Sequence, residues 1–243
     1  MSDNIDALFE AWPRIVQGIA VTTELTLGGA ALAFVLSLLL GCAVGTRTRW
    51  ARIPARLVIE FFRGTSLLVQ LFWLFYVLPL FGYQLDPLLC GIMALGLNYG
   101  AYGAEVVRGA LSAVPAAQKE ACIALGFSPW LQLRKVLFPQ AWVQMVPPLT
   151  NLLIQLLKGS ALASFILLQD LTYQIEQLRR GTGDTIFAFG VGLVVYFVLA
   201  YALTLLMNIV EIRAKRRLGL GPSLKEVLRI KPDRGDELVG VSR

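Results

Sequence analysis

The sequence predicts an all-α integral membrane protein with five transmembrane helices joined by polar segments. Of its 243 residues, 56% are hydrophobic and only 16% are charged, whereas a soluble domain carries roughly a quarter charged residues. Two uncharged runs, residues 25–46 and 185–210, contain 22 and 26 residues. About 20 apolar residues cross a bilayer as a helix, so each run is long enough, and a very apolar soluble core does not account for runs of this length.

Composition also excludes several classes of protein. The three cysteines, Cys42, Cys90 and Cys122, lie far apart without CxxC spacing, so neither a zinc site nor a disulfide framework is indicated. The sequence has no histidine, the commonest metal ligand, and no GxxxxGK[ST] phosphate loop. We therefore expect no cofactor, metal or catalytic residue in this chain. The net charge of +6 falls at the expected membrane boundaries, so nucleic acid is not an expected partner.

The first three spanning helices are expected in the N-terminal half. The first covers roughly 18–45, with Glu24 near its outer end. The second covers about 55–81, and the third runs from 87 to about 107. Each range is mainly apolar and has the length that a bilayer requires.

A polar connector, 108–139, separates these helices from the last two. The fourth helix is expected over 143–168 and is irregular, because Pro147 and Pro148 interrupt it. The fifth is expected over 184–211.

These elements divide the chain into three parts. We expect an external N-terminal segment over 1–17, a transmembrane domain over 18–211 that includes the connector, and a basic tail over 212–243 whose end is mobile.

Basic residues orient the helices, because short cytoplasmic loops collect Lys and Arg. The side expected to be cytoplasmic carries Arg47, Arg49, Arg52, Arg56, Arg108, Lys119, Arg134, Lys135, Arg213, Lys215, Arg216 and Arg217. The opposite side carries only Arg14, Arg179 and Arg180. The N-terminus is therefore expected outside and the C-terminus, with the connector, in the cytoplasm.

The connector has the pattern of two short helices at an angle to one another. Pro115 suits the first position of a helix, where its missing N–H costs nothing, and Gly126 suits the left-handed residue that ends one. Ser128 and Pro129 are typical of an N-cap and a first-turn proline. The second helix should stop before Pro139.

Residues of the connector also carry a resemblance to a known family. The pattern Glu120-Ala121-Cys122-x3-Gly126-x9-Val136-x-Phe138-Pro139 resembles the EAA loop of bacterial ABC importer permeases, with modest apolar departures at Cys122, Val136 and Phe138. In that family the loop forms the coupling helix that docks on the ATPase. The resemblance implies ATPase-coupling roles for Glu120, Ala121, Cys122, Gly126 and Pro139. An ordinary amphipathic loop is the alternative interpretation.

Three further segments extend the resemblance over most of the chain. FRGTSLLVQ at 62–70, GAYGAEVVRG at 100–109 and LKGSAL at 157–162 are similar to segments of the polar amino-acid permeases, the histidine/glutamine/arginine/opine branch. Ectoine/hydroxyectoine permease subunits look closest, especially over 60–80. The resemblance implies a type I ABC importer permease fold in the bacterial inner membrane.

The implied function is a permease subunit of an ATP-driven importer for polar amino acids or related zwitterions. Its implied partners are ABC ATPase subunits that bind ATP and Mg²⁺, a second permease subunit, identical or not, and an extracytoplasmic substrate-binding protein. Membrane lipid surrounds the complex.

Polar residues recur on single faces of two expected helices. Asn151, Gln155 and Lys158 are spaced i, i+4, i+7 on the fourth, and Asn98, Tyr102 and Glu105 share a face of the third. A charge at the bilayer centre costs about 2.5–3.5 kcal/mol on insertion scales, so such residues should face a pathway, a partner or one another. The candidates for a substrate path are Asn98, Tyr102, Asn151, Gln155, Lys158 and Ser160. Interhelical structural roles remain the alternative.

Two pairs have the spacing of neighbouring ions on a helix. Glu60 with Arg63 and Glu105 with Arg108 are each three residues apart, and we expect structural ion pairs.

Two other functions stay open. An ion-gradient-driven secondary transporter or channel subunit is favoured by the intramembrane Lys158 and Glu105. Against it stand the connector and the absence of an internal repeat, because many such transporters contain two inverted halves. The second is an assembly or anchoring subunit without a pathway.

Overall fold

The computed structural model describes residues 2–46 and 48–217, which form helices and connecting turns without a β-strand among them. The predicted all-α class is confirmed. The α-helices are α1 (Ser2–Gly45), α2 (Arg49–Gly64), α3 (Leu67–Phe72), α4 (Pro87–Ala113), α5 (Ala116–Ala124), α6 (Pro129–Gln132), α7 (Phe138–Gly159), α8 (Leu171–Thr182) and α9 (Thr185–Arg217). Two π-helices, η1 (Trp73–Val77) and η3 (Leu133–Leu137), and two 3₁₀ segments, η2 (Leu78–Phe81) and η4 (Ser160–Ile166), adjoin them.

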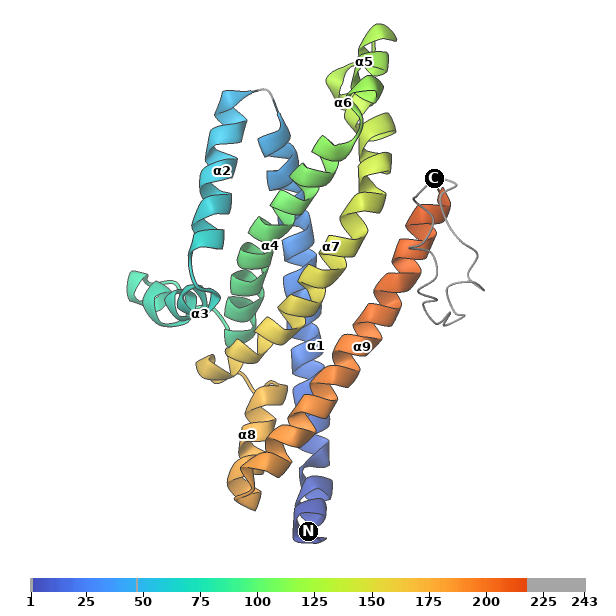
Figure 1. Cartoon of the computed structure of the whole chain (residues 1–243). Coiled ribbons are helices and arrows are strands. Elements are labelled where there is room, and N and C mark those ends of the chain that lie inside the picture. The colour runs from blue at the N-terminus through green and yellow to red at the C-terminus, as the bar shows by residue number, and fades with distance from the viewer. Residues whose placement is uncertain (1, 47, 218–243) are drawn as a thin grey trace, which may run out of the picture.

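The long helices α1, α4, α7 and α9 run side by side and give the molecule two distinct ends (Figure 1). The α1–α2 connection, the α5–α6 segment and the last turns of α9 lie at one end. The start of α1 and α8 lie at the other. The three basic groups that the sequence placed on one side of the membrane therefore share one end of the fold. The part of the expected basic tail beyond Arg217 lies outside the described residues.

Helix α4 is the centre of the bundle and packs most closely on α1. Small residues allow this approach: a Cβ atom at Gly96 would lie 2.5 Å from a methyl carbon of Leu32. A Cβ at Gly103 would collide with Ser37 of α1. Small residues let membrane helices approach closely, and neighbours then shield the helix from lipid.

Helix α1 begins earlier than the sequence suggested. The segment 1–17 was expected to be separate from a helix starting at residue 18, but α1 is continuous from Ser2. Its N-terminal part is held by packing, because Ala11 and Ile15 are buried against Leu171 and Ile175 of α8. With 44 residues α1 is about 66 Å long, which exceeds the roughly 30 Å hydrocarbon core.

The expected second span, 55–81, is not one straight helix. Helix α2 ends at Gly64, and the chain turns by 102° before the helical stretch Leu67–Phe81. Thr65 and Ser66 have extended backbone angles at this bend, which accounts for the break.

Three stretches of the described residues are long and apolar enough to cross a membrane: Asn4–Gly45, Pro129–Ile166 and Thr185–Arg216. The bent pair α2–α3 raises the number to four at most. Helix α4 has 27 residues, among them Asn98, Glu105 and Arg108, and is not one of these stretches. The count of five spans stays a prediction.

Candidate functional site

The α5–α6 segment forms the tip of one end of the molecule (Figure 1). Pro115 is the residue before α5 rather than its first residue. Gly126 ends the turn after α5 with φ of 70°, and its N–H donates to the carbonyl of Ile123 over 2.9 Å. Ser128 then caps α6, because its Oγ accepts a hydrogen bond from the N–H of Leu131, and Pro129 is the first residue of that helix. The local sequence thus determines a helix–turn–helix with a left-handed glycine at its corner.

This tip exposes large apolar side chains. Ile123, Leu125 and Trp130 are 61%, 71% and 68% exposed. Among the residues predicted to couple to an ATPase, Glu120, Ala121 and Gly126 are exposed, Pro139 is half-buried, and Cys122 is buried. A cluster of exposed apolar side chains beside polar ones is typical of a protein–protein contact surface.

The tip connects two long helices whose ends pack on one another. Val107, Ala110 and Val114 of the α4 end form one buried cluster with Leu137, Ala141 and Met145 of η3 and α7. This cluster holds the ends of α4 and α7 together at the base of the tip.

The expectation that the second short helix stops before Pro139 is wrong. Helix η3 leads into α7 without a break, and the N–H of Phe138 donates to the carbonyl of Leu133 in the wide π-helical pattern. Pro139 is then the second residue of α7 and directly follows this wide π-helical turn.

The polar face of α7 is open within this chain. Asn151, Gln155 and Lys158 are all exposed. Lys158 borders a groove of about 440 Å³ whose other residues come from α9: Leu193, Tyr196, Phe197, Ala200, Tyr201 and Thr204. The groove thus combines one cation, aromatic rings and hydroxyl groups.

Asn98 and Tyr102 bind the bend between α2 and α3. The Asn98 side chain donates to the carbonyl of Phe62 over 3.0 Å, and the Tyr102 hydroxyl donates to the carbonyl of Arg63 over 3.3 Å. Gln70 also donates to the Phe62 carbonyl, over 2.9 Å. These carbonyls belong to the last turn of α2 and lack helical partners, so the side chains satisfy them.

Only one of the two expected ion pairs is present. Arg108 binds Glu105 through two guanidinium nitrogens, with Nε 2.9 Å from the carboxylate. The ion pairs among the described residues do not include Glu60 with Arg63. The Arg63 guanidinium instead lies 5.4 Å from the centre of the Tyr102 ring of α4. Such cation–π contacts replace part of the attraction of an ion pair.

A buried polar junction joins α1, η4, α8 and α9. Asp170 caps α8 by accepting from the N–H of Tyr173 over 2.9 Å, and Thr22 of α1 accepts from the N–H of Leu171 over 3.0 Å. Thr22, Asp170 and the predicted path residue Ser160 are fully buried, and Tyr196 of α9 lies 2.7 Å from the Thr172 hydroxyl. Burial raises the pKa of Asp170 to about 6.

Sequence reasoning missed both this junction and helix α8. The signal for the helix was present, because Asp170 is a good N-cap and Leu171, Ile175 and Leu178 recur at i, i+4, i+7. Nothing local indicated that Thr22 and Tyr196 would join Asp170.

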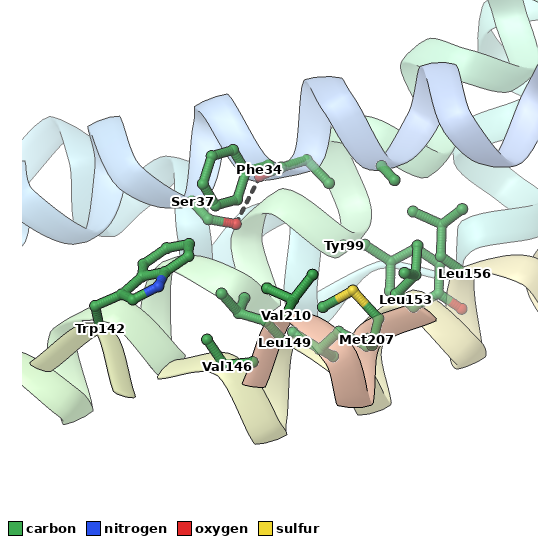
Figure 2. A pocket seen from close by; sticks show the side chains of 13 residues that line it. Phe34, Ser37, Tyr99, Trp142, Val146, Leu149, Leu153, Leu156, Met207 and Val210 are labelled. Atoms are coloured by element: carbon green, nitrogen blue, oxygen red, sulfur yellow. Dashed lines mark hydrogen bonds between the residues drawn. The ribbon is translucent and has the colours of Figure 1, made fainter. Parts of the chain in front are cut away.

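A separate cavity of about 210 Å³ lies between α1, α4, α7 and α9 (Figure 2). Phe34, Trp142 and Met207 are among its mainly apolar lining residues, and the predicted path residues are not. Ser37 contributes a hydroxyl that is already bonded to the carbonyl of Ala33. This lining suits hydrocarbon rather than a zwitterion.

No group of three or more His, Cys, Asp or Glu side chains that could hold a metal ion occurs within 2–46 and 48–217.

Comparisons with known proteins agree with this geometry. Residues 37–216 match the family described as "Binding-protein-dependent transport system inner membrane component". A probable amino-acid ABC transporter permease protein of Sinorhizobium fredii is 42% identical over 80% of this chain and 84% of its own length. The L-cystine transport system permease protein of Bacillus subtilis is 33% identical over 84% of this chain and 88% of its own.

A solved structure shares the fold. The crystal structure of an amino acid ABC transporter with histidines superposes with a TM-score of 0.78 at 30% identity. The match covers 85% of this chain and 96% of that one.

Proposed function

This chain belongs to the family of binding-protein-dependent transport system inner membrane components and is an amino-acid ABC importer permease, and on that premise we propose how it works. It forms the translocation path for polar amino acids or related zwitterions and is moved by ATPase subunits on separate chains. The N-terminus lies outside and the C-terminus in the cytoplasm. ATP and Mg²⁺ bind to the ATPase partner.

The observation that carries the proposal is the exposed apolar tip at α5–α6, which connects α4 to α7. Its exposed Ile123, Leu125 and Trp130 offer a contact surface to the ATPase, and Glu120 adds a charge beside them. Closure of the ATPase subunits would pull on this tip. The buried cluster at Val107 and Leu137 would carry the movement into both helices. Nucleotide must then bind one transporter state better than the other.

The path is assigned to the open polar face of α7. Asn151, Gln155 and Lys158 would face a second permease subunit across a central aqueous route, because their exposure to lipid would be costly. In the groove beside Lys158, the ammonium group would attract a substrate carboxylate, and the faces of Tyr201 and Phe197 would attract a substrate cation. Asn98, Tyr102 and Ser160 would shape this route indirectly, by holding the bend and the junction.

The substrate class is proposed from the relatives. Besides the L-cystine permease, the relatives include an octopine permease of Rhizobium radiobacter and an arginine permease of Bacillus subtilis, at 32% and 31% identity. All three substrates are zwitterions with a carboxylate. Ectoine and hydroxyectoine form a narrower proposal that rests on the similarity over 60–80 alone.

The test is ATP hydrolysis by the complex reconstituted with its ATPase and binding protein. We expect hydrolysis that vanadate inhibits and that the loaded binding protein stimulates, with amino-acid uptake following it. Uptake driven by an ion gradient without ATP would instead establish the secondary transporter.

Substitutions on α7 test the anchoring alternative. If Lys158→Met and Asn151→Leu leave uptake unchanged while the complex stays intact, the chain is an anchoring subunit without a pathway. Ectoine competing for uptake as well as arginine or cystine do would support the narrower substrate proposal.

Glu120→Lys tests the docking surface directly. The exposed carboxylate would be replaced by a cation at the contact, which should reduce co-purification of the ATPase while membrane insertion is retained. Equal recovery of the ATPase with mutant and native chains would count against the assignment.

A further inference from the structure

Helix α2 carries two parallel exposed stripes of different character. Arg49, Arg52 and Arg56 recur at i, i+3, i+7 and lie within an arc of about 60° on the helix surface. The second stripe is apolar and lies about 100° around the helix from the first. It contains Trp50, Ile53, Leu57 and Phe61. Trp50 is 91% exposed and Leu57 is 67% exposed.

Both stripes are free because α2 packs through a third face. Ala55 and Ile59 are buried, and Ile59 packs against Ala101 and Ala104 of α4. None of the three arginines forms an ion pair with another described residue. The first acidic residue of the helix, Glu60, comes one turn after Arg56.

From this juxtaposition we propose that the start of α2 binds an anionic phospholipid. Its arginines hold the phosphate headgroup, and the apolar stripe of Trp50, Ile53 and Leu57 lies along the acyl chains. A phospholipid joins an anionic phosphate to hydrocarbon chains in one molecule, and α2 presents cations and apolar carbon on neighbouring faces. A tryptophan at the boundary of the two also suits the membrane interface.

A second copy of this chain fits the same face poorly. In a two-fold contact each arginine stripe would lie close to an identical one, and like charges in contact disfavour association. The Arg63 guanidinium is not part of the site, because it lies over the Tyr102 ring.

The experiment titrates the purified full chain in detergent with phosphatidylglycerol and, separately, with phosphatidylcholine, and counts bound lipid by native mass spectrometry. We expect the native chain to prefer phosphatidylglycerol, with a preference that weakens as salt is added. Arg52→Gln/Arg56→Gln should lower the affinity for phosphatidylglycerol by about 30-fold, from about 1 kcal/mol for each basic residue near the surface. Arg52→Lys/Arg56→Lys keeps the charge and should stay within about three-fold of native.

The matched control is Arg179→Gln/Arg180→Gln on α8, at the opposite end of the molecule, where both arginines already bind Glu176. This variant should leave the affinity unchanged. An equal loss in the control, or no loss in Arg52→Gln/Arg56→Gln, would overturn the proposal. Displacement of the lipid by inorganic phosphate at equal concentration would replace it with a free-phosphate site. Efficient cross-linking of Arg52→Cys between two copies would replace it with a subunit interface.

Discussion

The α5–α6 tip and the junction around Asp170 are built in opposite ways. At the tip, the chain turns at Gly126 with open space around it, and large apolar side chains point outward. At the junction, Thr22 of α1, Ser160 of η4 and Asp170 at the start of α8 are fully buried, and the half-buried Tyr196 of α9 bonds to Thr172 at their edge. Substitutions at the tip should therefore weaken binding to a partner more than they destabilise the fold. Substitutions at the junction should mainly destabilise the fold, because its side chains are closely packed.

Replacing a glycine by valine in each region should give the largest difference in stability between them. The greater loss is expected at the junction. In Gly18→Val, even the first added carbon would lie 2.8 Å from Gln174 Cγ and 3.0 Å from the Asp170 carbonyl oxygen. Backbone atoms cannot yield as a flexible side chain does. We therefore expect a loss of about 3 kcal/mol, measured by thermal unfolding of the purified chain. A melting temperature within about 2 °C of native would show that α1 and α8 are not packed as described.

The second largest expected effect is a dependence of folding stability on pH, which arises from Asp170 at the junction. Because the pKa of Asp170 is raised to about 6 from its ordinary 3.8, the native state holds this proton more tightly than the unfolded chain. The protonated Asp170 carboxyl therefore contributes about 2–3 kcal/mol to folding stability below about pH 4. This contribution is lost as the pH rises through about 6. Asp170→Asn keeps an N-cap acceptor but cannot titrate. Melting temperatures measured between pH 4 and 7 should fall less steeply in the variant; parallel curves would contradict the assignment.

The same comparison explains what the sequence could and could not predict. The tip was predictable because Gly126, Ser128 and Pro129 act on their immediate neighbours, whatever the rest of the fold does. The junction was not, because Thr22 and Leu171 are 149 residues apart and neither has a local pattern that names the other.

The missed helix boundaries have the same cause. The start of α1 resembled a separate polar segment, but it continues the helix and packs on α8. The bend after Gly64 was overlooked although Gly64, Thr65 and Ser66 interrupt the apolar run there. The side chains that satisfy its carbonyls are Gln70 of α3 and Asn98 and Tyr102 of α4. Pro139 suggested a helix end, but the wide turn of η3 accommodates it.

Gly126→Val is the corresponding substitution at the tip, and its expected effect on stability is smaller than that of Gly18→Val. Its φ of 70° is unfavourable for a side chain, at a cost of about 1–2 kcal/mol, while open space means that no neighbour is displaced. The strain should alter the angle between α5 and α6. We expect weaker co-purification of the ATPase with nearly normal membrane insertion. A loss of folded protein as large as that of Gly18→Val would mean that the tip is not an independent surface.

Trp130→Ser should have the smallest effect on stability and still weaken the ATPase contact. The Trp130 side chain is 68% exposed and is not part of the buried cluster at the ends of α4 and α7. The free energy of unfolding, followed through the melting temperature, should therefore change by no more than about 0.5 kcal/mol. A tryptophan in a protein interface often contributes 2 kcal/mol or more, so ATPase affinity should fall at least about 30-fold. Ile186→Ser is the control, because Ile186 is 88% exposed at the start of α9, at the opposite end of the molecule. Affinity that fell equally in both variants would assign the loss to general solubility, whereas a fall confined to Trp130→Ser would locate the ATPase contact on the tip.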